Sequence, residues 1–440
     1  MLRLFKEHPE FDQYTKFDTI TGKLDALHEQ VFTGFLPPHH KMGSSGLEKV
    51  DFRGGSTFLG ETPSTHTRFP RRLYFQITRH CNLECAACFL KAERNGAHVP
   101  TRSILEIAEF MGRHGLMEVR LTGGEPTTHP DFMNILHKFQ EENVYVSVAT
   151  NGVIARKTLE AISEVKNVWI ICSVDGNKKT HNRYRPDTFD TIIGNLKYLK
   201  SRNPDVRIRL TTVLTRENKN QMFELGEIVK YVDAESITVI PLRPQVRNRS
   251  MISEMITAVE FRQVIEDLIE TKIKLGINFT TTIETSYKKE ISADPVFRKK
   301  SSCAAGREGT NLDFDRAKNE FLVYGCAYSP ACDLTADYAI RKPFLAGSFS
   351  PGNIPAFLDI WRDDSRWTVF RDLSFKSEDC RECVFKKRNQ CTGSCPIQNL
   401  DYSQLNIEED LLDQLKDQIA HTSEWYCYNK IIGKQSGSDS

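Results

Sequence analysis

Three cysteines lie within the stretch Cys81-Asn-Leu-Glu-Cys85-Ala-Ala-Cys88. They follow the alternating apolar run Leu73-Tyr-Phe-Gln-Ile-Thr78, which predicts a β-strand, so the thiols begin the loop after that strand. Thiolates are the usual ligands of iron–sulfur clusters, and a cluster of four irons requires four ligands. Three thiolates would hold three irons and leave the fourth iron open to a small molecule. An open metal position usually indicates chemistry.

Two other interpretations remain open on the spacing alone. The cysteines could form a zinc site together with a nearby histidine such as His80. They could also be buried on one face of a helix, since Cys81, Cys85 and Cys88 are spaced as i, i+4 and i+7. Both interpretations compete with the iron–sulfur cluster, because a short motif is a hypothesis until its structural context is known.

The loop Arg79-His-Cys-Asn-Leu-Glu-Cys-Ala-Ala-Cys-Phe89 resembles the signature loop of radical S-adenosylmethionine (SAM) enzymes. The resemblance implies that Cys81, Cys85 and Cys88 hold a [4Fe–4S] cluster whose open iron is chelated by the amino and carboxylate groups of SAM. One electron from the cluster would then cleave SAM and form a 5′-deoxyadenosyl radical. The family often has an aromatic residue or a histidine before the third cysteine. This chain has Ala87 there, at the position that contacts adenine in the family.

Further short motifs follow predicted strands and resemble other parts of that family's SAM site. Leu121-Thr-Gly-Gly-Glu-Pro126 combines two glycines, which permit a tight turn, with a carboxylate that can accept a hydrogen bond from an ammonium group. Alone, this motif fits an ordinary turn as well. Ala149-Thr-Asn-Gly152, Ser173-Val-Asp-Gly176 and His181-Asn-Arg-Tyr-Arg185 follow later strands. The resemblance implies that SAM is contacted by Gly123, Gly124 and Glu125 at its amino group, by Ser173 and Asp175 at its carboxylate or ribose end, and by Asn151 and Arg185 nearby.

From Arg71 to about Thr282, predicted strands alternate with helices of about 10–15 residues. This alternation predicts βαβ units and a parallel sheet. The predicted strands are 73–78, 118–121, 144–148, 168–174, 206–213, 236–241 and 277–281, and the helices are 102–114, 155–165, 188–201, 219–231, 258–275 and one after Pro130. Such units are too few for a closed eight-fold barrel, and the resemblance implies an α/β fold with a partial (β/α)6 TIM-like barrel. Active residues of such barrels follow the C-terminal ends of the strands.

The segments outside the barrel give weaker patterns. Residues 1–70 form an extension of unclear fold with long loops, in which Thr21–Phe32 has the spacing of a short helix. Peptide-modifying relatives often carry a leader-peptide recognition domain at this end. The strand-rich pattern of that domain is not visible, so we expect it to be absent. We divide the rest of the chain into a barrel at 71–285, a cysteine-rich domain at 286–432 and a flexible tail at 433–440.

Cysteines are concentrated after the barrel, and four form the close pattern Cys380-x2-Cys383-x7-Cys391-x3-Cys395. Chance rarely places four thiols so close together, so the pattern indicates metal binding, and two structural zinc sites are a fair alternative to iron–sulfur clusters. With Gly352-Asn-Ile and the Trp361 segment, it resembles the SPASM extension, which binds two auxiliary [4Fe–4S] clusters. The resemblance implies one cluster on Cys303, Cys326, Cys332 and Cys395, and the other on Cys380, Cys383, Cys391 and Cys427.

One spacing departs from that extension, because 22 residues separate Cys303 from Cys326 and Phe321 occupies a position that is glycine in the family. The departure concerns the local geometry and leaves the number of ligands unchanged. Full ligation by eight thiols favours electron transfer over direct binding of a substrate. The remaining cysteine, Cys172, lies in a predicted strand, and we expect it to be a packed residue.

Composition excludes several classes of function. Among 440 residues, 59 Lys and Arg balance 58 Asp and Glu, so the net charge of +1 gives no global basic field for nucleic acid. No apolar run approaches the roughly 18–20 residues that span a bilayer, and the N-terminus lacks the apolar core of a signal peptide. Twelve cysteines without an export signal favour metal ligation over disulfides. We therefore expect a cytoplasmic protein without a nucleic-acid or membrane partner.

The resemblance to radical SAM/SPASM proteins implies an enzyme with SAM and three [4Fe–4S] clusters, supplied with electrons by a donor such as flavodoxin or ferredoxin. Its expected substrate is a ribosomally made peptide, which it would cross-link or otherwise modify. Two alternatives remain, namely radical oxidation or epimerisation of a small metabolite such as an amino sugar, and a non-catalytic iron–sulfur electron carrier. A mere carrier needs no SAM site, so the glycine-rich and Ser173 motifs argue against it. No single residue can be assigned as a general acid or base.

Overall fold

The structure is a computed structural model of the whole chain. It describes residues 2–8, 13–18, 23–28, 47–50, 66–86, 88, 90, 92–242, 249–281, 304–329, 344–372, 375, 377–381, 395–397 and 411–421. The predicted tail at 433–440 lies outside the described residues.

Ten strands form one continuous sheet in the order β11-β10-β9-β8-β7-β6-β5-β12-β13-β14. From β5 to β11, every neighbouring pair of strands is parallel. These strands are β5 (Arg72–Thr78), β6 (Glu118–Gly123), β7 (Tyr145–Thr150), β8 (Val168–Ser173), β9 (Arg207–Leu214), β10 (Ser236–Pro241) and β11 (Phe279–Thr281). The predicted parallel sheet is therefore confirmed, with each predicted strand in its place.

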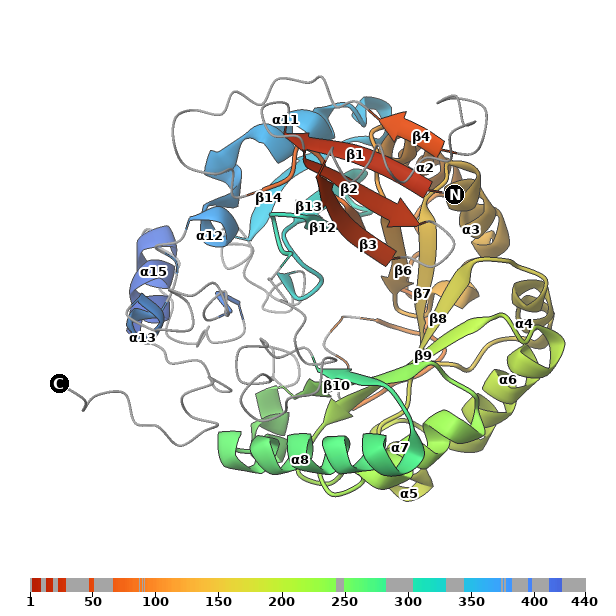
Figure 1. The fold of residues 1–440 in the computed structure, drawn as a ribbon. Coiled ribbons are helices and arrows are strands. Elements are labelled where there is room, and N and C mark those ends of the chain that lie inside the picture. The colour runs from red at the N-terminus through yellow and green to blue at the C-terminus, as the bar shows by residue number, and fades with distance from the viewer. Residues whose placement is uncertain are drawn as a thin grey trace.

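Helices connect the parallel strands and lie along the outer side of the curved sheet (Figure 1). They are α2 (Thr101–Arg113), α3 (Phe132–Glu141), α4 (Arg156–Ser163), α5 (Lys178–Tyr184), α6 (Phe189–Arg202), α7 (Met222–Tyr231) and α8 (Ala258–Leu275). Right-handed crossovers of this kind leave the inner face of the sheet uncovered by helices. The strands and helices together form the predicted partial barrel.

Side chains along each barrel strand alternate between the face covered by helices and the face toward the inside of the barrel. On β5, Leu73, Phe75 and Ile77 are at most 1% exposed and belong to the core beneath the helices. The intervening residues Tyr74 and Gln76 face the other way, toward the inside of the barrel, because successive side chains point to opposite faces of a strand. The apolar outer face holds the helices, so the inner face is available for polar groups.

Three strands after the barrel extend the same sheet. They are β12 (Gly309–Asp315), β13 (Glu320–Tyr324) and β14 (Leu345–Phe349). β12 pairs in parallel with β5, whereas β13 pairs antiparallel with both β12 and β14. The chain after the barrel therefore begins beside the first barrel strand, which is the strand that leads into the three-cysteine loop.

The N-terminal segment forms a separate small sheet in the order β3-β2-β1-β4. Its strands are β1 (Leu2–His8), β2 (Gln13–Asp18), β3 (Lys23–His28) and β4 (Leu47–Val50). The helix predicted at Thr21–Phe32 is therefore wrong, because β3 pairs antiparallel with β2 along its whole length. The expected absence of a leader-peptide recognition domain rested on a lack of strands in this segment. The four strands show that this premise is wrong. Whether such a domain is present stays untested.

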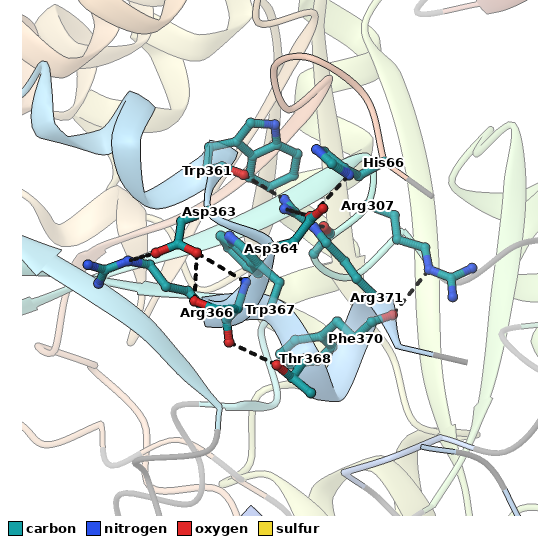
Figure 2. Close-up of polar contacts among 12 residues, drawn as sticks. His66, Arg307, Trp361, Asp363, Asp364, Arg366, Trp367, Thr368, Phe370 and Arg371 are labelled. Carbon is teal, nitrogen blue, oxygen red and sulfur yellow. Dashed lines mark hydrogen bonds and ion pairs between the residues drawn. The ribbon is translucent and has the colours of Figure 1, made fainter. Parts of the chain in front are cut away.

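A buried arginine, Arg371, contacts several parts of the chain that follows the barrel (Figure 2). Arg371 ends helix α12 (Thr368–Arg371) and is 5% exposed. Its guanidinium donates to the carbonyl oxygens of Gly306 at 2.7 Å and Trp361 at 2.9 Å, and it pairs with Asp364 at 2.7 Å. It also lies 4.8 and 4.9 Å from the ring centres of Trp361 and Trp367. Burial lowers the pKa of Arg371 to about 10, against the opposing effect of Asp364.

These contacts reach the segment that immediately follows Cys303. Gly306 has φ +65°, and a Cβ there would lie 2.8 Å from the Phe370 side chain. Its N–H lies 3.3 Å from the Gly325 carbonyl oxygen, directly before Cys326. The Arg371 contacts therefore hold together the chain next to two of the predicted cluster cysteines.

We predict that Arg371→Leu lowers the free energy of unfolding by about 2–4 kcal/mol, because two buried carbonyl groups lose their donor. The matched control is Arg102→Leu, whose side chain is 90% exposed in its pair with Glu106 and should cost less than about 1 kcal/mol. Urea titrations followed by tryptophan fluorescence measure both. Equal effects of the two substitutions would contradict a special role for Arg371.

Candidate active site

The described residues of the three-cysteine loop form no helix or strand, and neighbouring backbone holds them in place. The Gly124 N–H donates to the Thr78 carbonyl oxygen and the Glu125 N–H to the His80 carbonyl oxygen, both at 2.8 Å. On the other side, the Cys81 N–H donates to the Glu93 carbonyl oxygen at 3.0 Å. The helical interpretation of the cysteine spacing is therefore wrong, because the described part of the loop is non-helical.

Three glycines permit this close approach. A Cβ on Gly124 would lie 2.1 Å from the His80 carbonyl oxygen, and one on Gly96 would lie 2.2 Å from the Arg79 carbonyl oxygen. Gly123 has φ +132°, where side chains are strained, and a Cβ there would meet the Thr78 carbonyl oxygen. The Gly-Gly pair thus brings the end of β6 against the backbone that carries the thiols.

The three thiols are close enough to affect one another electrostatically. Burial raises the pKa of Cys81 to about 11, and Glu125, Cys85 and Cys88 add to the shift. The Leu83 N–H lies 3.5 Å from the Cys81 sulfur. Such a set of three neighbouring sulfur ligands suits an iron–sulfur cluster, whose binding would deprotonate the thiols.

The zinc alternative with His80 gains no support. His80 Nδ1 lies 2.9 Å from the Thr128 hydroxyl, with which it shares a hydrogen bond. Within the described residues, no group of three or more His, Cys, Asp or Glu side chains has the geometry of a metal-ion site. His80 therefore supports the loop through Thr128.

Glu125 lies fully buried beneath the loop, with 0% exposure. Its Oε1 accepts from the Thr127 and Thr150 hydroxyls at 2.6 and 2.8 Å, and its Oε2 accepts from the Asn151 N–H at 2.7 Å. Burial raises the pKa of Glu125, while these hydrogen bonds oppose the shift. The carboxylate thereby joins the end of β6 to the end of β7.

Asn151 continues this connection to the cysteines. Its Nδ2 donates to Asn82 Oδ1 at 2.8 Å and lies 3.8 Å from the Cys81 sulfur. Asn82 in turn donates to the Val153 carbonyl oxygen at 2.7 Å. Sequence reasoning did not assign Asn82, although its place directly after Cys81 within the signature loop was a usable signal.

A second buried charge lies at the end of β8. Asp175 Oδ2 accepts from Arg185 Nε at 2.6 Å, and Oδ1 accepts from the Val213 N–H at 2.8 Å. Burial alone would lower the pKa of Arg185, but Asp175 and Cys85 raise it above its usual range. Arg185 Nη1 lies 3.8 Å from the Cys85 sulfur, so a fixed positive charge faces one of the three thiols.

His181 stabilises the position of Asp175, the partner of Arg185. Its Nδ1 accepts from the Asp175 N–H at 3.2 Å, and its Nε2 lies 3.2 Å from the Thr188 hydroxyl. Burial and Arg185 together lower the pKa of His181 to about 4. The imidazole is therefore neutral at physiological pH, as its acceptor role toward Asp175 requires.

The structure thus brings most of the predicted site residues to one edge of the sheet, at the C-terminal ends of β5 to β8. Ser173 lies at the same edge, with its hydroxyl 3.5 Å from that of Thr211. Ala87 lies outside the described residues. Cys172 is fully buried among core side chains, which confirms that it is a packed residue.

The C-terminal cysteines are described only in part. Cys326 follows β13, with its sulfur 3.6 Å from the Ser329 hydroxyl, and Cys380 is buried in helix α13 (Glu378–Arg381). Cys395 packs against the hydrophobic core. The other predicted ligands lie outside the described residues, namely Cys303, Cys332, Cys383, Cys391 and Cys427.

We predict that Gly124→Ala prevents assembly of a cluster on the loop, because the new methyl group would displace the His80 carbonyl. Gly194→Ala is the matched control: Gly194 lies in α6, and a Cβ there meets nothing within 4 Å. That control should stabilise the protein by roughly 0.5–1 kcal/mol. Iron analysis after anaerobic reconstitution measures the effect, and an unchanged iron content in Gly124→Ala would show that the close approach is dispensable.

Comparisons with known proteins agree with this geometry. Residues 75–228 match the Radical SAM superfamily model. The chain is 24% identical to the AdoMet-dependent heme synthase of Methanosarcina barkeri, over 74% of this chain and 91% of the relative. It is also 24% identical to the mycofactocin maturase MftC of Mycobacterium tuberculosis, over 74% and 78% of the two chains.

The fold is also that of a solved structure. Streptococcus suis SuiB bound to precursor peptide SuiA has a TM-score of 0.64 at 17% identity, covering 96% of this chain and 97% of SuiB. No helix in the described ranges is long and apolar enough to cross a membrane. The matched model and the arrangement of the motifs identify residues 75–228 as a radical SAM domain.

Proposed function

We propose that this protein is a radical SAM enzyme that modifies a peptide. One observation carries the proposal: Cys81, Cys85 and Cys88 lie on one loop at the edge of the sheet where Glu125 and Arg185 converge. The three thiolates would hold a [4Fe–4S] cluster, which would supply the electron for reductive cleavage of SAM to methionine and a 5′-deoxyadenosyl radical that takes a hydrogen atom from the substrate.

The residues around the loop have separable roles. Burial raises the pKa of the Cys85 thiol, and Arg185, whose Nη1 lies 3.8 Å from the sulfur, opposes that shift. Glu125 fixes the ends of β6 and β7 through hydrogen bonds to both of its oxygens. Asp175 accepts in the same way from Arg185 and Val213. A carboxylate has about four acceptor positions, so both residues can still accept from a ligand. The expected contacts with SAM are Gly123, Gly124 and Glu125 at its amino group, Ser173 and Asp175 at its carboxylate or ribose end, Asn151 and Arg185 nearby, and the backbone at Ala87.

We also propose two auxiliary [4Fe–4S] clusters. The segment that directly follows Cys303 hydrogen-bonds to Gly325, which directly precedes Cys326, so these two cysteines suit one cluster. Cys332 and Cys395 complete that set by resemblance, and the second set is Cys380, Cys383, Cys391 and Cys427. The clusters would carry electrons between the active site and a donor such as flavodoxin or ferredoxin. Such clusters require a reducing compartment, so the cytoplasm stays our prediction.

A peptide is the favoured substrate. MftC is named a maturase, and SuiB was solved with a precursor peptide, which indicates peptide modification in proteins that share this fold and its domain. The similarity to a heme synthase supports the second candidate, radical chemistry on a small metabolite. Mass spectrometry of products from short peptides encoded beside this protein's gene would separate the two candidates.

We predict that Cys85→Ala abolishes reductive cleavage of SAM, because two thiolates cannot present the open iron securely. Cys172→Ala removes a thiol that packs in the core beneath the helices and should retain cleavage. Chromatography of 5′-deoxyadenosine formed under dithionite measures both variants. Normal yield from Cys85→Ala would mean that the loop does not hold the SAM-cleaving cluster.

A second prediction concerns metal content. Anaerobically reconstituted protein should contain about twelve irons and twelve sulfides per chain, as three four-iron clusters require. Elemental analysis checks this number. Two bound zinc ions with only four irons would instead assign the C-terminal cysteines to structural zinc.

A further inference from the structure

Two buried carboxamides on neighbouring strands have no use in the site described above. Gln76 on β5 is 1% exposed, and Asn311 on β12 is 0% exposed. Both polar atoms of each side chain, Oε1 and Nε2 of Gln76 and Oδ1 and Nδ2 of Asn311, have no hydrogen-bond partner within the described residues. Such groups are uncommon in folded proteins, because a buried polar group without a partner loses its hydrogen bonds to water and gains none in return.

The sheet register places the two side chains on the same face. Asn311 pairs with Tyr74 across β12 and β5, and Gln76 lies two residues further along β5. Their neighbours Phe75 and Leu312 pair with each other and belong to the core beneath the helices. Because strand residues alternate between faces, Gln76 and Asn311 point to the inside of the barrel.

Charged residues of the inner face already have partners. Arg120 lies over the Tyr74 ring at 5.2 Å, and Arg209 lies over the Trp169 ring at 3.8 Å. Near the cysteine loop, Asp313 forms an ion pair with Arg79. The carboxamides differ from these charged groups in lacking a protein partner among the described residues. Trp169 Nε1 is a further buried polar atom of this face without a partner in that part of the chain, but of these groups only the carboxamides combine donors with acceptors.

We propose that Gln76 and Asn311 recognise an amide group of the substrate inside the barrel. A carboxamide carries both a donor and an acceptor, so two of them can satisfy the N–H and the C=O of one amide together. Gln76 lies five residues before Cys81 on the strand that leads to the cysteine loop, so a bound amide would lie near the site of radical formation. This assignment rests on the proposed function, because it deepens the choice of a peptide as substrate.

Binding of small probes tests the proposal without SAM turnover, so a failure of the radical chemistry would not affect the result. N-acetylalanine N-methylamide supplies backbone amides, propionamide supplies a side-chain type amide, and methyl propionate is the matched ester, which has no amide N–H. Saturation-transfer NMR on the full-length, reconstituted protein should show that at least one of the first two binds better than the ester. Whichever of them binds better identifies the backbone or side-chain amide as the group recognised.

The double variant Gln76→Met, Asn311→Leu keeps the shapes but removes the polar atoms. We expect amide binding to weaken about tenfold, since a lost pair of buried hydrogen bonds easily costs that factor. The matched control is Thr212→Val, which removes an equally buried hydroxyl without a partner from the helix-facing side of β9. This control should bind the probes as the wild type does.

Thermal unfolding separates recognition from a structural role. Replacing both carboxamides with apolar side chains of similar shape should leave the midpoint unchanged or raise it, because no hydrogen bond within the protein is lost. A clear fall in the midpoint, or failure to fold, would mean that the carboxamides serve the fold and would overturn the proposal. Equal binding of the amides and the ester by the wild type, no binding at all, or unchanged amide binding by the double variant would overturn it as well.

Discussion

The position of the cysteine loop depends on a few backbone hydrogen bonds from the end of β6. The loop contains little regular structure, so its three thiols are placed by the N–H groups of Gly124 and Glu125, which donate to the Thr78 and His80 carbonyls at 2.8 Å. Those hydrogen bonds require glycine at position 124, since a Cβ would lie 2.1 Å from the His80 oxygen. The buried Glu125 carboxylate then ties this turn to the end of β7. Cluster ligands and cofactor-binding turns are thus positioned as one unit.

The sheet connects that unit to the C-terminal segment. β5 lies between β6 and β12, so the strand that leads to the thiols is shared by the barrel and the chain that follows it. The Arg79–Asp313 ion pair joins the two just before the cysteine loop. Arg371 joins the residues just before β12 to helix α11 (Ala356–Arg362), through its hydrogen bonds to the carbonyl oxygens of Gly306 and Trp361. If auxiliary clusters form there, a continuous hydrogen-bonded sheet fixes their distance from the first cluster.

The sequence predicted the barrel well because each strand has an apolar outer face with regular alternation, as in Leu73, Phe75 and Ile77. It predicted the segment Thr21–Phe32 wrongly because three apolar residues in a short stretch fit a helix and a strand equally, and pairing with β2 decided the outcome. The partners of Glu125 could not be predicted. Thr150 is 25 residues away, and only the parallel pairing of β6 with β7 brings the two together.

Residue roles were harder to predict than residue positions. The motifs located Glu125 and Asp175 at the strand ends, but the internal hydrogen bonds that their carboxylates accept are a property of the folded protein. Gln76 and Asn311 belong to no motif, and their burial without partners is visible only in three dimensions. The strands β12 to β14 were likewise missed, because the cysteine pattern of that segment says nothing about its backbone.

The most direct test of the central claim is electron paramagnetic resonance of the dithionite-reduced protein with and without SAM. If the loop holds a [4Fe–4S] cluster with an open iron, SAM should change the g-values of one cluster signal, and that signal should be absent from a variant in which Cys81, Cys85 and Cys88 are all replaced with alanine. Cluster signals that do not respond to SAM, or a SAM-responsive signal that survives loss of the three thiols, would contradict the assignment of this loop.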